Sequence, residues 1–544
     1  MDVARVCAAE AAARHLPGNG RRRLRGRAEP RVHSRTLPPT LALLGLLSVG
    51  PNVRPSTAQC ADGSAPPCQA SAARSAPPPN SVAVLYFDNL SRDTADAYLA
   101  EGLTEELIAQ LGRVERLVVK SRNAARRYRA AELDPAQLGR ALGVAHLVSG
   151  SVRRSGTRLR VTVELVRAPS GVRLWGEQYD RAQADLLDLQ EGIARAVTTV
   201  IAGRLLPAER ASLADRPTRS PEAYDYFVKG NYYLAQRTAR SADRAVDQYR
   251  AALRLDPGFT RALARIGYAN AQTLYWGSFA EAAPADSVLA RGLAAADGAL
   301  GQDSGSSDAW MARAFLLSYR YPRAAVMARE AIERAVALDP RNAEAHHQYG
   351  TFLTNHGEYA AAVGQYQQAL TIDPQRGTTL AGLGMVSLRR REYAAARDWL
   401  DSSLAVDPGF YPGYVRRAEA RLLLGDTAAA RSDAETAVRL SAGDPLLGEA
   451  ALALVEARAG DTLAARARVS RLLREVALLE QRIRGGAVLA MALVALGDHR
   501  GALDLLERLR PRGTWLWDQL QFPEFDAVRA HPRFLRLVEE SRPR

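Results

Sequence analysis

Lysine and histidine side chains often take part in catalysis, but here both occur in patterns that argue against it. Lys120 and Lys229 are the two lysines of the chain, and neither lies in the Gly-rich loop that sets a lysine against nucleotide phosphates. Lys120 also lacks the loop and acidic motifs of a kinase. His346, His347 and His356 form the one histidine cluster, without further ligands at metal-site spacing. We therefore expect no enzyme activity, no metal and no cofactor.

Three prolines in the second half of the chain recur at a fixed interval. Pro340, Pro374 and Pro408 lie 34 residues apart, and each follows an apolar residue and an aspartate. A fixed period of this length is typical of stacked helix pairs, and 34 residues is the tetratricopeptide (TPR) period. The sequence therefore predicts an all-α superhelical solenoid over residues 221–510, with six to eight helix pairs.

The register of these repeats places small residues at one position. Counted from Ala343, position 8 holds Gly350, then Gly384 and Ala418 in the next two repeats. A small residue is needed where the two helices of a pair approach closely. We expect a larger side chain at this position to push the helices apart.

The inner groove of such an array is lined by positions 2, 5, 9, 12 and 13 of the first helix in each pair. In the clearest repeats the candidate groove residues are Glu344, His347, Thr351, Asn355, Met385, Arg389, Val415 and Glu419. They do not reproduce the Lys/Asn/Arg clamp on a peptide carboxylate for which this repeat family is known. We expect the groove to bind a protein or peptide in another way; the alternative is a purely structural spacer.

A separate α/β domain precedes the repeats. The apolar run Val82–Phe87 predicts a strand buried on both faces. The alternation from Leu159 to Leu165 predicts a half-buried strand in a hairpin. Asp134 and Pro135 predict the start of a helix that ends at Gly143. The expected order β-α-β-α-β-β-β-α gives a mixed-sheet sandwich over residues 81–206, joined to the repeats by a linker at 207–220.

Residues 81–206 also resemble a known family. Gly102–Leu107 (GLTEEL), Gly150–Arg154 (GSVRR) and Trp175–Arg181 (WGEQYDR) are similar to motifs of the TolB amino-terminal-like (FlgO-like) domain. That domain commonly precedes TPR repeats in bacteria. The resemblance implies a non-catalytic module of envelope or signalling proteins. Many relatives carry an adenylate cyclase, kinase or DNA-binding domain ahead of it, whereas residues 1–80 here are too short for one.

The N-terminal region raises the question of targeting. Arg21–Arg27 is basic, Thr40–Gly50 is an apolar run shorter than a membrane span, and Ser56–Ala58 is a small-x-small site. Residues 1–58 therefore indicate a signal peptide or a short membrane anchor, and 59–80 a disordered Pro/Ser/Ala linker. We expect a periplasmic or envelope location rather than a cytoplasmic one. Cys60 and Cys68 could form a disulfide there or be incidental.

The distribution of the net charge bears on whether the chain binds nucleic acid. The net charge of +14 lies partly in the first 35 residues and is otherwise spread along the chain, so we expect no nucleic-acid partner.

The tail at 511–544 carries Trp515, Trp517, Phe522, Phe525 and Phe534. We interpret it as a helical cap on the last repeat, with a ligand patch as the alternative.

Together these patterns predict an α+β multi-domain protein, in which a small α/β sandwich precedes a TPR solenoid. The expected function is a non-enzymatic interaction scaffold of the bacterial envelope. The alternative is a regulatory subunit that acts in trans on an adenylate cyclase, a kinase or a transcription regulator.

Overall fold

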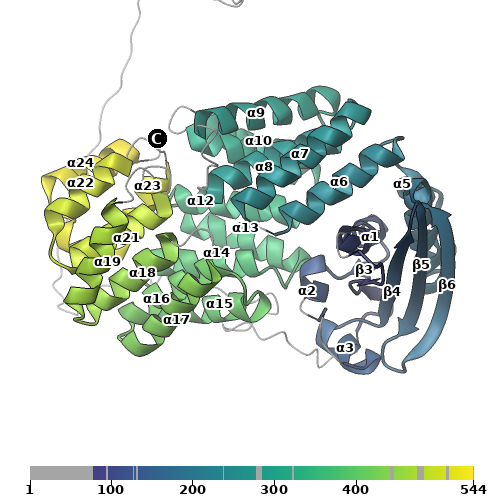
Figure 1. The fold of residues 1–544 in the computed structure, drawn as a ribbon, viewed down its shortest axis with the longest axis horizontal. Coiled ribbons are helices and arrows are strands. Elements are labelled where there is room, and N and C mark those ends of the chain that lie inside the picture. The colour runs from purple at the N-terminus through teal and green to yellow at the C-terminus, as the bar shows by residue number, and fades with distance from the viewer. Residues whose placement is uncertain are drawn as a thin grey trace, which may run out of the picture. The chain divides into compact units, whose positions relative to one another are not determined.

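The computed structural model describes residues 77–542, apart from 94–95, 127, 130–132, 237, 277–284, 321–323, 442–445, 475–482 and 510–513. The expected signal or anchor region, with Cys60 and Cys68, lies outside the described residues. Within the described ranges, no helix has both the length and the apolar character to span a membrane. Figure 1 shows the elements with the labels used below.

The α/β domain holds the predicted mixed sheet, in the spatial order β3-β1-β4-β5-β6 with β2 beside β4. Strands β1, β2, β3 and β4 pair in parallel, whereas β4, β5 and β6 form an antiparallel meander. The strands are β1 (Ser81–Val84), β2 (Asp88–Asn89), β3 (Val118–Val119), β4 (His146–Ser155), β5 (Arg158–Arg167) and β6 (Val172–Ala182). The helical segments of this domain are α1 (Ala97–Gly112), α2 (Arg122–Arg126), α3 (Pro135–Leu142), η2 (Gln183–Asp185) and α4 (Leu186–Ala202).

Both faces of the sheet are covered, as alternating side chains require. In β1, Val82 and Val84 join the core under α1 and α4, while Ala83 joins a smaller core with α3. All three side chains are fully buried. Helix α3 begins at the predicted capping pair, since the Asp134 side chain accepts a hydrogen bond from the backbone of Gln137. The predicted fold class is therefore confirmed for this domain.

The segment predicted as a linker, 207–220, contains helix α5 (Pro207–Ala214). Arg116 of the α/β domain forms a two-pronged ion pair with Glu209, at 2.7 and 2.6 Å. Leu213 is buried in the core of the α/β domain. These contacts hold the segment against the α/β domain.

The helical array consists of consecutive helices that pack in pairs, eight in the described part of the chain. The first four pairs are α6 (Pro221–Leu234) with α7 (Ala239–Leu255), α8 (Thr260–Trp276) with α9 (Ala285–Gln302), α10 (Ser307–Leu317) with α11 (Ala325–Leu338), and α12 (Ala343–Asn355) with α13 (Tyr359–Ile372). The next four are α14 (Gly377–Arg389) with α15 (Tyr393–Val406), α16 (Tyr411–Leu423) with α17 (Thr427–Leu440), α18 (Leu446–Arg458) with α19 (Thr462–Arg474), and α21 (Ile483–Ala495) with α22 (His499–Leu509). A short 3-10 turn, η3 (Ser318–Arg320), follows α10.

The small residues at position 8 lie where the paired helices meet. A Cβ atom added to Gly350 would come within 2.6 Å of the Tyr366 ring. A Cβ atom added to Gly384 would come within 2.8 Å of Leu400 and 3.3 Å of the backbone oxygen of Ala396. Ala418 is buried as well. The register derived from the prolines therefore places a tight helix contact where the structure has one.

The C-terminal segment, residues 514–542, comprises α23 (Thr514–Gln519), η5 (Pro523–Val528) and α24 (Pro532–Ser541). Phe522, Phe525 and Phe534 are fully buried and share a core with α18, α21 and α22. Segment 514–542 thus covers the apolar face that the last helix pair would otherwise expose. Helix α23 also packs against α12, more than one hundred and fifty residues earlier in the chain.

Segment 514–542 contains a buried carboxyl group. Glu524 is 9% exposed, and neither of its side-chain oxygens accepts a hydrogen bond from another described residue. Burial, reinforced by the nearby carboxylate of Glu419, raises the pKa of Glu524 to about 7, although Arg458 and Arg389 oppose the increase. The protonated form of Glu524 therefore fits the folded chain better than the ionised form.

We predict that substitution of Gly384 by leucine destabilises the array by about 1–3 kcal/mol, because the side chain must displace Leu400. The matched control is Gly364→Leu in α13, where an added Cβ meets nothing within 4 Å. This control should stabilise the helix slightly, because leucine has the higher helix propensity. Denaturant unfolding of both variants measures the difference. Equal changes in the free energy of unfolding would show that the assigned register is wrong.

We also predict a pH-dependent effect of Glu524→Gln. Between the usual carboxyl pKa of 4.5 and the folded value of about 7, the unfolded chain releases a proton that the folded chain retains. The contribution of Glu524 to stability therefore falls as pH rises through this window, by roughly 3 kcal/mol in total, and is constant above it. Glu524→Gln should raise the thermal midpoint at pH 8 but not at pH 4. The exposed Glu539→Gln is the control, and a lower midpoint of Glu524→Gln at pH 8 would contradict the prediction.

Candidate functional site

A cavity of about 420 Å³ runs along the face formed mainly by the first helices of the pairs. Its walls come from α6, α8, α10, α12, α14 and α16, with further residues from α1 and α2 of the α/β domain and from α23. The site is therefore composite: the array forms most of the wall, and the segments before and after the array complete it.

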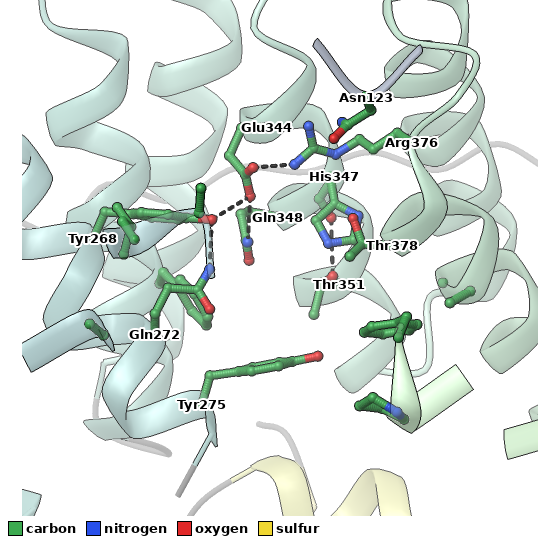
Figure 2. A pocket seen from close by; sticks show the side chains of 18 of the residues that line it. Asn123, Tyr268, Gln272, Tyr275, Glu344, His347, Gln348, Thr351, Arg376 and Thr378 are labelled. Carbon is green, nitrogen blue, oxygen red and sulfur yellow. Dashed lines mark hydrogen bonds and ion pairs between the residues drawn. The ribbon is translucent and has the colours of Figure 1, made fainter. Parts of the chain in front are cut away.

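Glu344, at the start of α12, is the centre of a hydrogen-bond network in this wall (Figure 2). Tyr268 Oη and Gln348 Nε2 each donate to Glu344 Oε1 at 2.9 Å, and Arg376 pairs with Glu344 Oε2. Gln272 Nε2 donates in turn to Tyr268 Oη at 2.6 Å. Burial alone would raise the pKa of Glu344, but Arg376, together with His347, Gln348 and Tyr268, lowers it well below its usual range. Glu344 therefore stays ionised and fixes its neighbours.

His347 lies three residues after Glu344 on α12, in the same wall. Its Nδ1 atom is 3.2 Å from Thr379 Oγ1, and its ring centroid is 5.7 Å from that of Tyr366. Thr351 donates a hydrogen bond to the backbone oxygen of His347 at 3.1 Å (Figure 2). His346 points elsewhere and is bound by Gln365. No group of three or more histidines, cysteines and acids that could hold a metal occurs among the described residues.

The structure brings five of the eight candidate groove residues together. The five that line the cavity are Glu344, His347, Thr351, Asn355 and Met385. The other three, Arg389, Val415 and Glu419, do not line it and are buried. They occupy the predicted face of the first helices, but another part of the chain contacts this face at Arg389 and beside Glu419.

The covering part is segment 514–542. Arg389 donates to both carboxylate oxygens of Asp518, at 2.8 and 2.5 Å, and its guanidinium lies 3.5 Å from the centroid of the Phe522 ring. Both side chains of this ion pair are at most 2% exposed. The repeat register predicted that Arg389 lies on the groove surface. In the structure, Arg389 instead forms a buried ion pair.

Glu419 is covered in the same way. Its two carboxylate oxygens accept hydrogen bonds from Arg416 at 2.8 and 2.9 Å, and Arg416 lies 3.3 Å from Gln519 Oε1. Periodicity could place these residues on one helix face, but it carried no information on a segment about one hundred residues away that packs onto that face.

The α/β domain supplies wall residues that sequence reasoning missed. Asn123 Nδ2 donates to Asp373 Oδ2 at 2.9 Å, and the Ser121 hydroxyl also bonds Asp373. Between them, Arg122 pairs with Glu105 at 2.8 Å. Helix α2 therefore meets the turn between α13 and α14. The short segment around α2 has no periodicity, so no sequence pattern indicated this contact.

Side-chain amides are frequent in the wall, as numerous as the Thr and Tyr hydroxyls together. The seven that line the cavity are Asn123, Asn231, Gln272, Asn342, Gln348, Asn355 and Gln519. Each amide can donate and accept a hydrogen bond. They come from the α/β domain, from the array and from α23, so amides line the cavity along its length.

Comparison with known proteins supports the repeat assignment. Residues 331–364 match the family model "Tetratricopeptide repeat". A stretch of 195 residues is 34% identical to a protein of Rhizobium meliloti (strain 1021) named "Putative adenylate cyclase 3", and it spans 35% of this chain and 33% of that protein. This chain thus matches about a third of the length of that relative.

Among solved structures, the chain is similar to PilF of Pseudomonas aeruginosa, with 21% identity over 40% of this chain and 90% of that one and a TM-score of 0.32. A TPR protein of Parabacteroides merdae has 15% identity over 48% of this chain and 98% of that one, with a TM-score of 0.33. Human IFIT1 has 15% identity over 60% of this chain and 85% of that one, with a TM-score of 0.41. The helical part of this chain, in which the family model matches, contains TPR repeats.

Proposed function

We propose that this protein is a non-enzymatic scaffold of the bacterial envelope that binds a segment of a partner protein in the cavity. The observation that carries the proposal is the set of seven amide side chains along the wall. A peptide backbone presents one N–H donor and one C=O acceptor per residue, and a side-chain amide complements both. The TPR repeats support a role in protein interaction.

The envelope location rests on the pattern of residues 1–58, which lie outside the described residues. The resemblance of residues 81–206 to the TolB amino-terminal-like domain points the same way. The mixed sheet with helices on both faces is compatible with that resemblance.

The 34% match to a protein named as an adenylate cyclase favours a second candidate function. In this alternative the chain is a regulatory subunit that acts in trans on a cyclase, and its partner is cytoplasmic. The two candidates thus differ in the compartment that contains the partner.

The test fills the cavity in the full chain. Thr351→Trp places a large side chain in the cavity, whereas Thr371→Trp makes the same change on the exposed side of α13. Wild type and both variants are immobilised and incubated separately with periplasmic and cytoplasmic extracts of the native cells. We expect wild type and Thr371→Trp to retain the same periplasmic proteins and Thr351→Trp to lose them.

Two other results would count against the proposal. Proteins that Thr351→Trp retains as well as wild type bind outside the cavity. Proteins that come only from the cytoplasmic extract, and that include a cyclase whose activity changes on binding, would favour the regulatory alternative.

A further inference from the structure

We propose that the end of the cavity next to the α/β domain binds a carboxylate group, so that the partner segment is an acidic peptide. This inference rests on the proposed function and names the chemical class of its ligand. It derives from four arginines in the cavity wall and from the guanidinium N–H groups that they leave without acceptors.

Arg261 and Arg265 lie four residues apart on α8, so both point from one face of this helix, and both line the cavity. The nearest carboxylates are 3.7 Å from Arg261, in Glu106, and 3.9 Å from Arg265, in Asp308. These separations are longer than hydrogen bonds. Arg261 Nη1 is buried and has no hydrogen-bond partner among the described residues.

Two further arginines flank this pair from other elements. Arg122 of α2 and Arg376, directly before α14, also line the cavity. Arg122 is bonded to Glu105 and Arg376 to Glu344. The Nε atom of Arg376 is buried without a partner among the described residues. Arginines from the α/β domain, from α8 and from the α13–α14 turn therefore line one cavity.

The carboxylates of the wall leave some of these guanidinium N–H groups without an acceptor. Glu105 and Glu344 are each engaged in a direct bond to one arginine, while Glu106 and Asp308 stay beyond hydrogen-bond distance. A buried donor without an acceptor costs free energy, and a carboxylate that reaches it recovers this cost. A carboxylate matches the fork of a guanidinium with two parallel hydrogen bonds. The pair Arg261 and Arg265 is therefore the part of the wall best suited to an acidic side chain.

The remainder of the cavity indicates why the carboxylate belongs to a peptide. The cavity continues from the arginines to Asp518 and Gln519 of α23, and amide side chains line this stretch. A small anion would contact the arginines alone, whereas an extended peptide would reach both the arginines and the amides.

The experiment selects peptides from a random library displayed on phage, with the full chain as bait. We expect the selected peptides to be enriched in Asp and Glu. A synthetic copy of the best peptide should bind at least tenfold more tightly than the same peptide with Gln and Asn in place of Glu and Asp. Binding of the acidic peptide should also weaken as salt is raised, because the interaction is between charges.

Two matched double variants test whether the carboxylate binds at Arg261 and Arg265. Arg261→Gln with Arg265→Gln should weaken binding of the acidic peptide at least tenfold and leave the neutral peptide unchanged. The control is Arg250→Gln with Arg254→Gln, an exposed pair at the same spacing on α7 that does not line the cavity. The comparison of the two peptides on wild-type protein needs no variant, so the test holds even where the double variant fails to fold.

Four outcomes overturn the inference. Peptides that bind in the cavity without acidic enrichment, or that tolerate Arg261→Gln with Arg265→Gln, leave the proposed function intact and refute the carboxylate site. Inorganic phosphate that displaces the peptide at similar concentration shows a site for small anions instead. Failure to select any peptide counts against both the inference and peptide binding in the cavity.

Discussion

The arrangement of this protein depends on the burial of helix α6, the first helix of the array, between the α/β domain and the helices that follow. Tyr224 and Phe227 of α6 are fully buried. Tyr224 Oη donates to Gln190 of α4 at 2.8 Å, and the Phe227 ring lies 4.8 Å from that of Phe259, just before α8. One apolar core therefore includes α1, α4 and the first three helices of the array. Fully buried aromatic side chains each contribute on the order of 2–3 kcal/mol, so this contact is a strong one.

The cavity follows from that contact. Gly102 in α1 lies so close to α6 that an added Cβ would meet Val228 at 2.0 Å. With the α/β domain held there, Ser121 and Asn123 reach Asp373 in the fourth helix pair. The α/β domain thus lines one end of the cavity, and α23 lines the other through Asp518 and Gln519. A repeat array alone would present an open face, whereas here the flanking segments add walls to it.

Sequence reasoning was effective wherever a local period carried the information. The alternation in β5 predicted the burial of Leu159, Val161 and Val163, because side chains in a strand alternate between faces. The 34-residue period predicted the helix pairs, because each pair must bury the same face against the next. The same register placed Glu344 and His347 on the face that lines the cavity.

The remaining features depend on contacts between distant segments, for which the sequence has no period. Arg389 looked like a groove residue by register, but it pairs with Asp518, 129 residues later. The segment 207–220 looked like a linker because it has few large apolar residues. Its Thr218 nevertheless bonds Asp256 at 2.5 Å, and its Leu213 enters the shared core. Local composition did not reveal that the partners of these residues lie in other elements.

The central claim is that the α/β domain and the array form one unit through α6, and a cut between them tests it most directly. A specific protease site replaces the exposed residues at 214–216. The cleaved protein is then passed over a sizing column without denaturant. The shared core predicts that the two pieces elute together at the size of the uncut chain and separate only in denaturant. Elution as two separately folded fragments would contradict the account, because the cavity would then lack its α/β wall.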